Sequence, residues 1–272
     1  MRFMLFIKSE PTTESGAAPG ADTAAALAKY NAELTKAGVL LATEGFAPSA
    51  VGARINYADG HFSTKPGPFA PADRQIAGFW LIQTKSKDEA IEWAKRCPVG
   101  EGEIEIRQVY EVEDFPVAPT AEAGDMRDRE QGTPPRAPVV AANSGKSAQR
   151  KPFVTLLKAD HHSETALTPA PNAALLREMG ALMEETVQAG ALLGGEGLKP
   201  SAVGARVRFS AGKPRLFDGP FAETHELVAG YALILAGSLD EALGWARRCL
   251  DIHVRGTGVE YGAIEVRALR EH

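Results

Sequence analysis

Cysteine is scarce in this sequence, and its scarcity excludes a fold held together by disulfides. Only two cysteines, Cys97 and Cys249, occur among the 272 residues, whereas small disulfide scaffolds are dense in them. Both lie at matching places in helical patterns, so we predict that they are buried free thiols. Aromatic residues are also few, at 7%, while apolar residues make up 44%. This composition is typical of a soluble globular protein with two modest cores.

The sequence also lacks an excess of basic residues and any long apolar run. Its formal net charge is −5, and it has no cluster of Lys and Arg that would follow a phosphate backbone, which argues against nucleic-acid binding. No apolar run approaches the roughly 20 residues of a membrane helix, and the N-terminal residues do not resemble a signal peptide. We therefore expect a cytoplasmic protein with neither a nucleic-acid nor a membrane partner.

What the sequence does contain is a repeat. Pro48–Arg54 returns unchanged as Pro200–Arg206, and Gly67–Ala70 returns in the same register as Gly219–Ala222. Self-similarity at a constant offset is the signature of a duplicated structural unit. We predict two copies of one domain, at residues 1–115 and 151–272.

The segment between the copies, residues 116–150, is rich in Pro, Ala, Gly and charge and has no sustained apolar period. Such a segment cannot bury enough apolar surface to offset the entropy of ordering it, so we predict a flexible linker. The second copy also has extra residues around His253–Gly258, which we interpret as a loop insertion.

Each copy shows the same succession of strand and helix patterns. Continuous apolar runs predict strands buried on both faces at residues 3–7, 77–82, 153–157 and 229–235. The predicted first helices, at about 22–37 and 172–189, end at Gly38 and Gly190. The second helices begin after the N-caps Ser86 and Ser238. An alternating strand, a hairpin return and a final alternating strand complete each copy.

This order, β-α-β(hairpin)-β-α-β, predicts an α+β fold with a ferredoxin-like sheet in each copy. Helices would cover one face of the sheet and leave the other face bare. We predict that the two copies bury these bare faces against each other, as a pseudo-dimeric α/β barrel within one chain, with further homodimerisation as an option.

The run Phe217–Glu226 reads Phe-Asp-Gly-Pro-Phe-Ala-Glu-Thr-His-Glu and resembles the Asp-Gly-Pro-Phe signature of the YCII-related (DGPF) family. Glu196–Leu198 and Pro200–Ala202 are also similar to that family, so the resemblance covers most of the second copy and, through the repeat, the first. It implies a bacterial protein that pairs into an α/β barrel, often beside an extracytoplasmic-function sigma factor. Some relatives use a His-Asp pair in lyase-type chemistry. This chain departs from the pattern at His225, where the family often has Lys, and at Pro66, which replaces the Asp in the first copy.

Asp218 and His225 are the candidate acid–base pair. They are separated by a tight turn, so the carboxylate has the means to orient the imidazole for proton transfer. The alternative is that Asp218 begins the turn by bonding its own backbone and His225 is a solvated loop residue. If the pair is catalytic, only the second copy retains the chemistry.

The candidate ligand-binding residues are Arg206, Arg54, Glu196, Glu44 and Phe221. The two arginines lie on the polar faces of matching strands, where guanidinium groups suit a carboxylate or phosphate. The alternative for Arg54 and Arg206 is a structural ion pair with Glu265 or Glu105. For the two glutamates the alternative is a capping or salt-bridge role.

No cofactor motif is present, and we expect neither a cofactor nor a metal. Asp160, His161 and His162 are ligand types, but a metal site would need His253 or His225 to converge on them. The leading hypothesis is binding of a small, anionic molecule between the repeats, with acid–base catalysis as an option. The alternative is a non-catalytic interaction or regulatory module, linked to a sigma factor.

Overall fold

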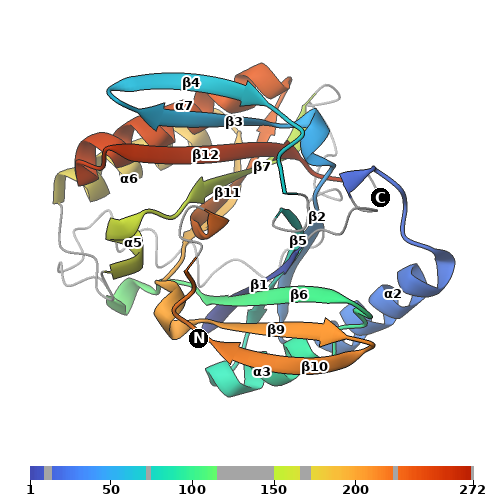
Figure 1. Cartoon of the computed structure of the whole chain (residues 1–272). Coiled ribbons are helices and arrows are strands. Elements are labelled where there is room, and N and C mark those ends of the chain that lie inside the picture. Colours follow the sequence, from blue (N-terminus) through green and yellow to red (C-terminus); the bar gives the residue numbers. More distant parts are fainter. Residues whose placement is uncertain (9–13, 72–74, 115–149, 166–172, 223–225, 271–272) are drawn as a thin grey trace.

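The computed structural model describes residues 1–8, 14–71, 75–114, 150–165, 173–222 and 226–270. Within them the protein is a mixed α+β structure with two antiparallel six-stranded sheets, one above the other in Figure 1. The first copy supplies β1 (Arg2–Lys8), α2 (Ala21–Lys36), β2 (Leu40–Gly45), η1 (Ser49–Val51), β3 (Ala53–Ala58), β4 (His61–Pro66), β5 (Ile76–Gln83), α3 (Lys87–Lys95), β6 (Gly102–Gln108) and η3 (Val112–Asp114). The second supplies β7 (Lys151–Lys158), α5 (His161–Thr165), α6 (Ala173–Gln188), β8 (Leu192–Gly197), η5 (Ser201–Val203), β9 (Ala205–Ser210), β10 (Lys213–Asp218), β11 (Val228–Ala236), α7 (Leu239–Thr257) and β12 (Tyr261–Ala268). The predicted linker, 116–150, lies outside the described residues except for its last one.

The helix boundaries follow the capping residues. Ser86 and Ser238 accept hydrogen bonds from the backbone N–H groups of Glu89 and Glu241, as expected for N-caps. Gly38 and Gly190 adopt left-handed φ angles of 70° and 62° after α2 and α6, which confirms the predicted helix ends.

The interpretation of residues 253–258 as a loop insertion was wrong. The extra residues prolong α7 to Thr257, and Gly258 ends the helix with a φ of 69°. Leu250, His253 and Val254 are buried along this helix. Tertiary burial therefore outweighs the low helix propensity of Gly256 in this segment.

The two sheets have the strand orders β10-β9-β6-β1-β5-β2 and β4-β3-β12-β7-β11-β8. The central positions of β1, β5, β7 and β11 confirm the prediction made from their apolar runs. The hairpins, however, are exchanged between the repeats. The second copy's β9–β10 pairs with β6, and the first copy's β3–β4 pairs with β12.

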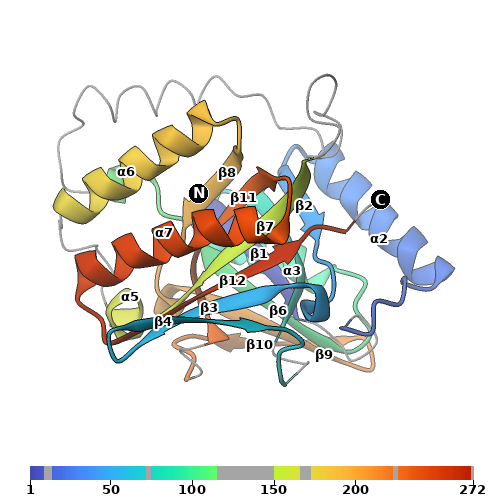
Figure 2. The same cartoon turned by 90° about the horizontal axis from the view of Figure 1, so that it is seen from above.

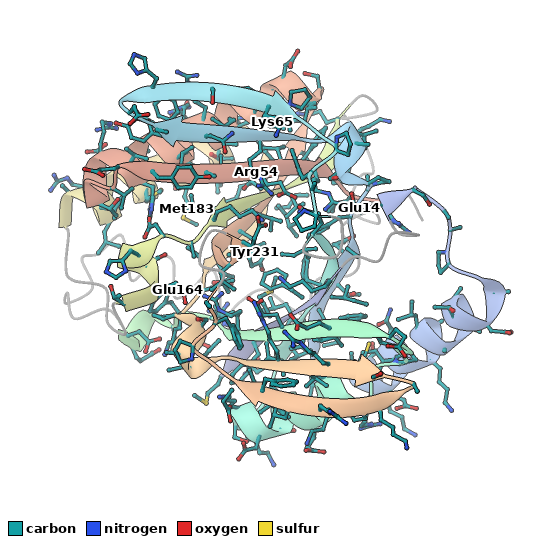
Figure 3. The ribbon with its side chains drawn as sticks, in the orientation of Figure 1. Glu14, Arg54, Lys65, Glu164, Met183 and Tyr231 are labelled. Carbon is teal, nitrogen blue, oxygen red and sulfur yellow. The ribbon has the colours of Figure 1, made fainter. Side chains whose placement is uncertain are left out.

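Two kinds of core hold these layers together. Helices α3 and α7 pack on the outer faces of the sheets, where α6 and α7 also lie side by side (Figure 2). The inner faces pack on each other through side chains from both copies, including Phe6, Phe79, Leu156 and Tyr231. Tyr231 lies between the sheets in Figure 3. Residues of both copies therefore share one core between the sheets.

Backbone contacts also join the two sheets at their ends. Phe46 after β2 forms a bridge with Leu269 after β12, and Val109 after β6 forms one with Leu198 after β8. The backbone N–H of Ala47 donates to the carbonyl of Ala268. Isolated bridges thus link the two sheets at two places.

The two cysteines are free, as predicted. Cys97 is buried and Cys249 is partly buried. No helix in the described part of the chain is long and apolar enough to cross a membrane.

Candidate functional site

Two clusters of ionised side chains lie on the facing sides of the sheets, related by the internal repeat. The first centre consists of Lys8, Glu103, Glu105, Arg107 and Arg206. The second centre consists of Lys158, Glu265, Arg267, Arg54 and Glu226. The hairpin exchange builds both centres, because it brings Arg206 of the second copy to Glu105 and Arg54 of the first copy to Glu265.

In the first centre one carboxylate is surrounded by three cations. Glu105 Oε2 lies 3.0 Å from Arg206 Nη2 and 3.3 Å from Lys8 Nζ. Its Oε1 lies 3.3 Å from Arg107 Nη1. Arg206 Nε donates to the same Glu105 oxygen at 3.2 Å, and it also lies 3.2 Å from Oε1 of a second carboxylate, that of Glu103. Each charge here has a close counter-charge.

The second centre repeats this arrangement around Glu265. Its Oε2 accepts a 2.7 Å hydrogen bond from Arg54 Nη2 and lies 3.4 Å from Lys158 Nζ. The other oxygen, Oε1, is 3.6 Å from Arg267 Nη1, which is too far for a good hydrogen bond. The side chains of Glu265 and Lys158 are 1% and 2% exposed, whereas that of Arg54 is 16% exposed. Of these three side chains, that of Arg54 is therefore the most exposed.

The cations control the protonation of the buried carboxylates. Burial acts to raise the pKa of Glu265, but Lys158, Arg54 and Arg267 outweigh it and lower the pKa to about 2. Lys8, Arg107 and Arg206 do the same for Glu105, whose pKa is also about 2. Burial lowers the pKa of Lys158, with Glu265 acting in the opposite direction.

The Gly-Pro-Phe loops hold the two hairpin arginines in place. A Cβ on Gly219 would lie 1.8 Å from the carbonyl oxygen of Ser201, so only glycine allows this close approach. The N–H of Phe221 then donates to Ser201 Oγ, and its ring stacks on Arg206 at 3.9 Å from Cζ. Gly67, Ser49 and Phe69 repeat these contacts around Arg54. In both copies the Gly-Pro-Phe residues therefore have a structural role.

One difference between the two centres concerns Glu103. Glu103 of the first copy, which pairs with Arg206 and Arg208, corresponds to Ala263 in the second copy. Arg206 Nε also donates to Glu105 Oε2 at 3.2 Å, whereas Arg54 Nε has no hydrogen-bond partner among the described residues, although it is buried. Glu265 Oε1 and Glu226 Oε2 are buried without a partner in the same sense. No atom of the first centre shows this within the described residues.

Sequence reasoning missed the buried Lys8, Lys158, Arg107 and Arg267 as members of these clusters. Arg107 donates to the carbonyl oxygen of Lys199 at 2.7 Å, and Arg267 donates to that of Ile76 at 2.8 Å. Each arginine thus joins its own copy to the other. The sequence contains a pattern that could have identified the two arginines. The motif Glu-x-Arg occurs at the same place in the final strand of each repeat, as Glu105–Arg107 and Glu265–Arg267.

The predicted acid–base pair is not brought to either centre in the described residues. Asp218 has a side chain that is 69% exposed and pairs with Lys87 Nζ at 2.9 Å. Since Arg206 lies opposite Phe217 in the hairpin, Asp218 points to the other face of β10. His225 lies outside the described residues.

The remaining predicted ligand-binding residues lie elsewhere between the sheets. Glu196 on β8 forms an ion pair with Arg2, at the opposite end of β1 from Lys8. Glu44 is buried at the matching place on β2. Arg54, Arg206 and Phe221 do belong to the centres, and the ion pairs considered as their alternative are present.

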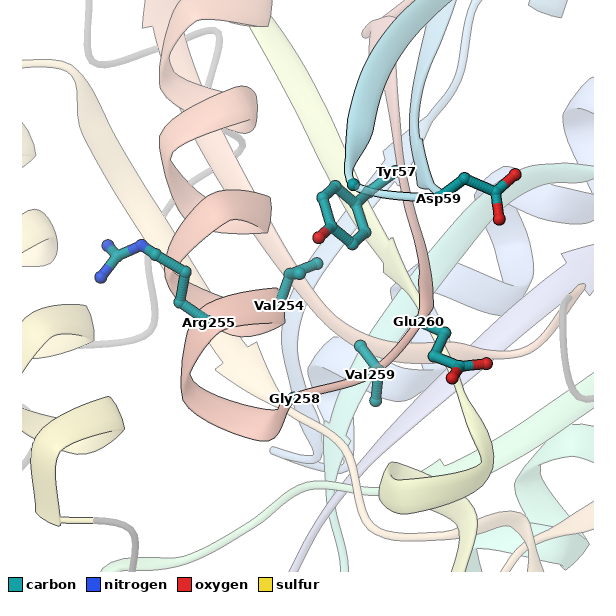
Figure 4. Close-up of a pocket in the computed structure, with 8 residues that line it drawn as sticks. Tyr57, Asp59, Val254, Arg255, Gly258, Val259 and Glu260 are labelled. Atoms are coloured by element: carbon teal, nitrogen blue, oxygen red, sulfur yellow. The ribbon is translucent and has the colours of Figure 1, made fainter.

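Two other places have features of a site: the His253–Asp160 pair and a pocket at the end of α7. His253 Nε2 does converge on Asp160, at 2.7 Å from Oδ2, and Asp160 also accepts from the N–H of Ser163 in α5. No cluster of three metal-ligating side chains occurs in the described part. An open pocket of about 460 Å³ lies between the β3–β4 turn and the end of α7 (Figure 4), lined by Tyr57, Asp59, Gly60, Val254, Arg255, Gly258, Val259 and Glu260. Within the described residues, neither place has a buried polar atom that lacks a hydrogen-bond partner. The second centre does have such atoms.

Comparisons with known proteins agree with the internal duplication. The family model of the YCII-related domain matches twice, at residues 1–113 and 152–267. A curated relative, "Uncharacterized protein R00369" of Rhizobium meliloti (strain 1021), is 34% identical over 117 residues, which cover 43% of this chain and 90% of the relative. The chain therefore belongs to the YCII-related family, as a tandem duplication of its domain.

Proposed function

We propose that the protein binds a small carboxylate at the second centre, between its two repeats. The observation that carries this proposal is the buried Nε of Arg54, a charged donor without a partner in the described residues. Leaving such a donor unpaired costs free energy that a ligand oxygen would recover. A guanidinium also offers the planar geometry that a carboxylate matches.

The comparison between the two centres supports a ligand at one of them. In the first centre Glu103 places a carboxylate beside Arg206 Nε, at 3.2 Å. Ala263 leaves the corresponding place beside Arg54 without that group. A free carboxylate would therefore supply in the second centre what a side chain supplies in the first.

Calorimetric titration with propionate tests this proposal. The wild-type protein is expected to bind saturably, while Ala263→Glu, which restores the missing carboxylate, is expected to weaken binding at least about tenfold, because it occupies the same donor. Arg54→Lys keeps the charge but removes Nε and should weaken binding as well. The matched control, Glu103→Gln, alters only the first centre and should bind as the wild type does.

The absence of saturable binding to the wild-type protein would refute the proposal. So would equal affinity for wild type, Ala263→Glu and Arg54→Lys, with thermal unfolding confirming that all three are folded.

We also propose that the sheets form one pseudo-symmetric, ferredoxin-like α/β barrel. The bridges Phe46–Leu269 and Val109–Leu198 support closure at both corners, and the shared inner core supports it as well. The order β6-β1-β5-β2 within the first copy supports the ferredoxin-like arrangement.

Acid–base catalysis by Asp218 and His225 stays a prediction. The ion pair of Asp218 with Lys87 favours the alternative in which this carboxylate is structural. If the alternative holds, Asp218→Asn leaves propionate binding unchanged. A loss of binding would favour the catalytic pair.

A second candidate function, an interaction module, is favoured by the exposed apolar side chains of α6. Leu176, Met183 and Val187 follow one stripe of this helix, and Arg177 and Glu184 beside the stripe would complement each other across an antiparallel second copy. The first copy has Asn31 where the second has Met183. Sedimentation of the full chain tests this function: Met183→Asn should dissociate a dimer, and a monomeric wild-type protein would refute it.

A further inference from the structure

We infer that the ligand of the second centre carries a hydrogen-bond donor next to its carboxylate, so that it is a small hydroxy acid or amino acid. This inference rests on the proposed function and makes its ligand class more specific. It comes from the kinds of atom that lack partners. The second centre has one unpaired donor, Arg54 Nε, but also two unpaired acceptors, Glu265 Oε1 and Glu226 Oε2.

A plain carboxylate satisfies only the donor. It would leave both glutamate oxygens buried and unpaired, and it would add a negative charge beside them. The cations present do not meet this need, since Arg267 Nη1 is 3.6 Å from Glu265 Oε1 and Lys158 Nζ lies near the other oxygen, Oε2. A hydroxyl or ammonium group on the ligand would pair with these acceptors.

The contact between Arg54 and Glu265 favours a short ligand. A single carboxylate, that of Glu265, bonds Arg54 through Oε2 while presenting the unpaired Oε1. Glu226 lies two residues before Val228, which is in register with Lys158, and its charge opposes the lowering of the Lys158 pKa by burial. We expect a donor on the carbon next to the ligand carboxylate to reach these acceptors when that carboxylate meets Arg54.

In the first centre, the charged groups have partners among the side chains of the protein itself. Glu105 there has both oxygens within 3.3 Å of a cation, and Arg206 has two carboxylate partners. No unpaired buried acceptor is found in it among the described residues. Among the described residues, the unpaired acceptors are therefore a feature of the second centre.

Three ligands with one carbon skeleton test the inference: propionate, lactate and alanine, titrated calorimetrically into the full-length protein. Lactate or alanine is expected to bind about tenfold to a hundredfold more tightly than propionate, the range for one hydrogen bond to a charged group. Glu226→Gln, which removes an acceptor charge, should narrow the advantage of alanine over propionate. Glu103→Gln, in the first centre, should leave that advantage unchanged.

The outcomes distinguish the carboxylate site from the requirement for a donor on the ligand. If propionate binds as tightly as lactate and alanine, the required donor is refuted while the carboxylate site stands. If none of the three binds, both ideas fail, and ordered water is then sufficient to satisfy the buried atoms. If alanine and lactate bind more tightly but Glu226→Gln and Glu103→Gln reduce the advantage equally, the assignment to the second centre is wrong.

Discussion

Replacing Glu265 by glutamine removes the negative charge at the middle of the second centre. Arg54, Lys158 and Arg267 then lose their shared counter-charge in a place where Glu265 is 1% exposed. Removing one partner of a buried ion pair typically costs about 3–5 kcal/mol, since the remaining charges stay buried. We expect Glu265→Gln to lower the free energy of unfolding near pH 7 by about that amount.

The same residue predicts how stability depends on pH. The folded protein lowers the pKa of Glu265 from 4.5 to about 2. A lowered pKa means that the unfolded chain takes up the proton first, so the stabilisation is complete above about pH 5 and is lost as the pH falls toward 2. At about 1.4 kcal/mol per pKa unit, the carboxylate accounts for about 3.5 kcal/mol over this window.

Urea unfolding at several pH values between 3 and 7 measures both effects. In Glu265→Gln the steep loss of stability below pH 5 should shrink, leaving the equivalent contribution of Glu105. The control is Glu92→Gln, in an exposed pair with Lys95, which should change stability by under about 0.5 kcal/mol. The electrostatic account is refuted if Glu265→Gln retains the pH dependence of the wild type.

Three further predictions concern the framework. Gly219→Ala should destabilise the protein, because the added Cβ would lie 1.8 Å from the Ser201 carbonyl oxygen. Gly180→Ala, on open helix surface, should stabilise the protein by up to about 1 kcal/mol. Similar urea midpoints for the two variants would contradict this prediction. Native Cys97 and Cys249 should react slowly with a thiol reagent at pH 8, because burial raises their pKa values to about 12 and about 11; rapid labelling without unfolding would count against their burial. A protease site inserted at residue 135 should yield fragments that co-elute on a sizing column after cleavage, since the hairpins are exchanged; separate elution would argue against the exchange.

Local patterns predicted the elements of this fold well because each depends on nearby residues. The apolar runs around Phe6 and Leu156 identified the central strands, and Ser86 and Gly38 set helix ends through backbone bonds within a turn. The helical extension of α7 was missed because its stability comes from burial of His253 and Val254, which is a tertiary effect.

The hairpin exchange was beyond sequence reasoning for a physical reason. Alternation assigns the face of Arg54 but not the strand beside it, and the two copies offer nearly the same final strand, with Glu105 in one and Glu265 in the other. The ion-pair alternatives for Arg54 and Arg206 were foreseen. The sequence does not say which arginine lies beside Glu103 and which lies beside Ala263. The importance of Ala263 became clear only from the pairing of β3 with β12.

The most direct test of the carboxylate site is the nuclear magnetic resonance signal of the Arg54 Nε–H group during titration with propionate. The signal is assigned by its loss in Arg54→Lys, and Arg206 Nε–H, which already faces Glu103, serves as the internal reference. We predict a saturable shift of the Arg54 signal and none of the Arg206 signal. Equal shifts of both signals, or no shift of the Arg54 signal, would contradict the account.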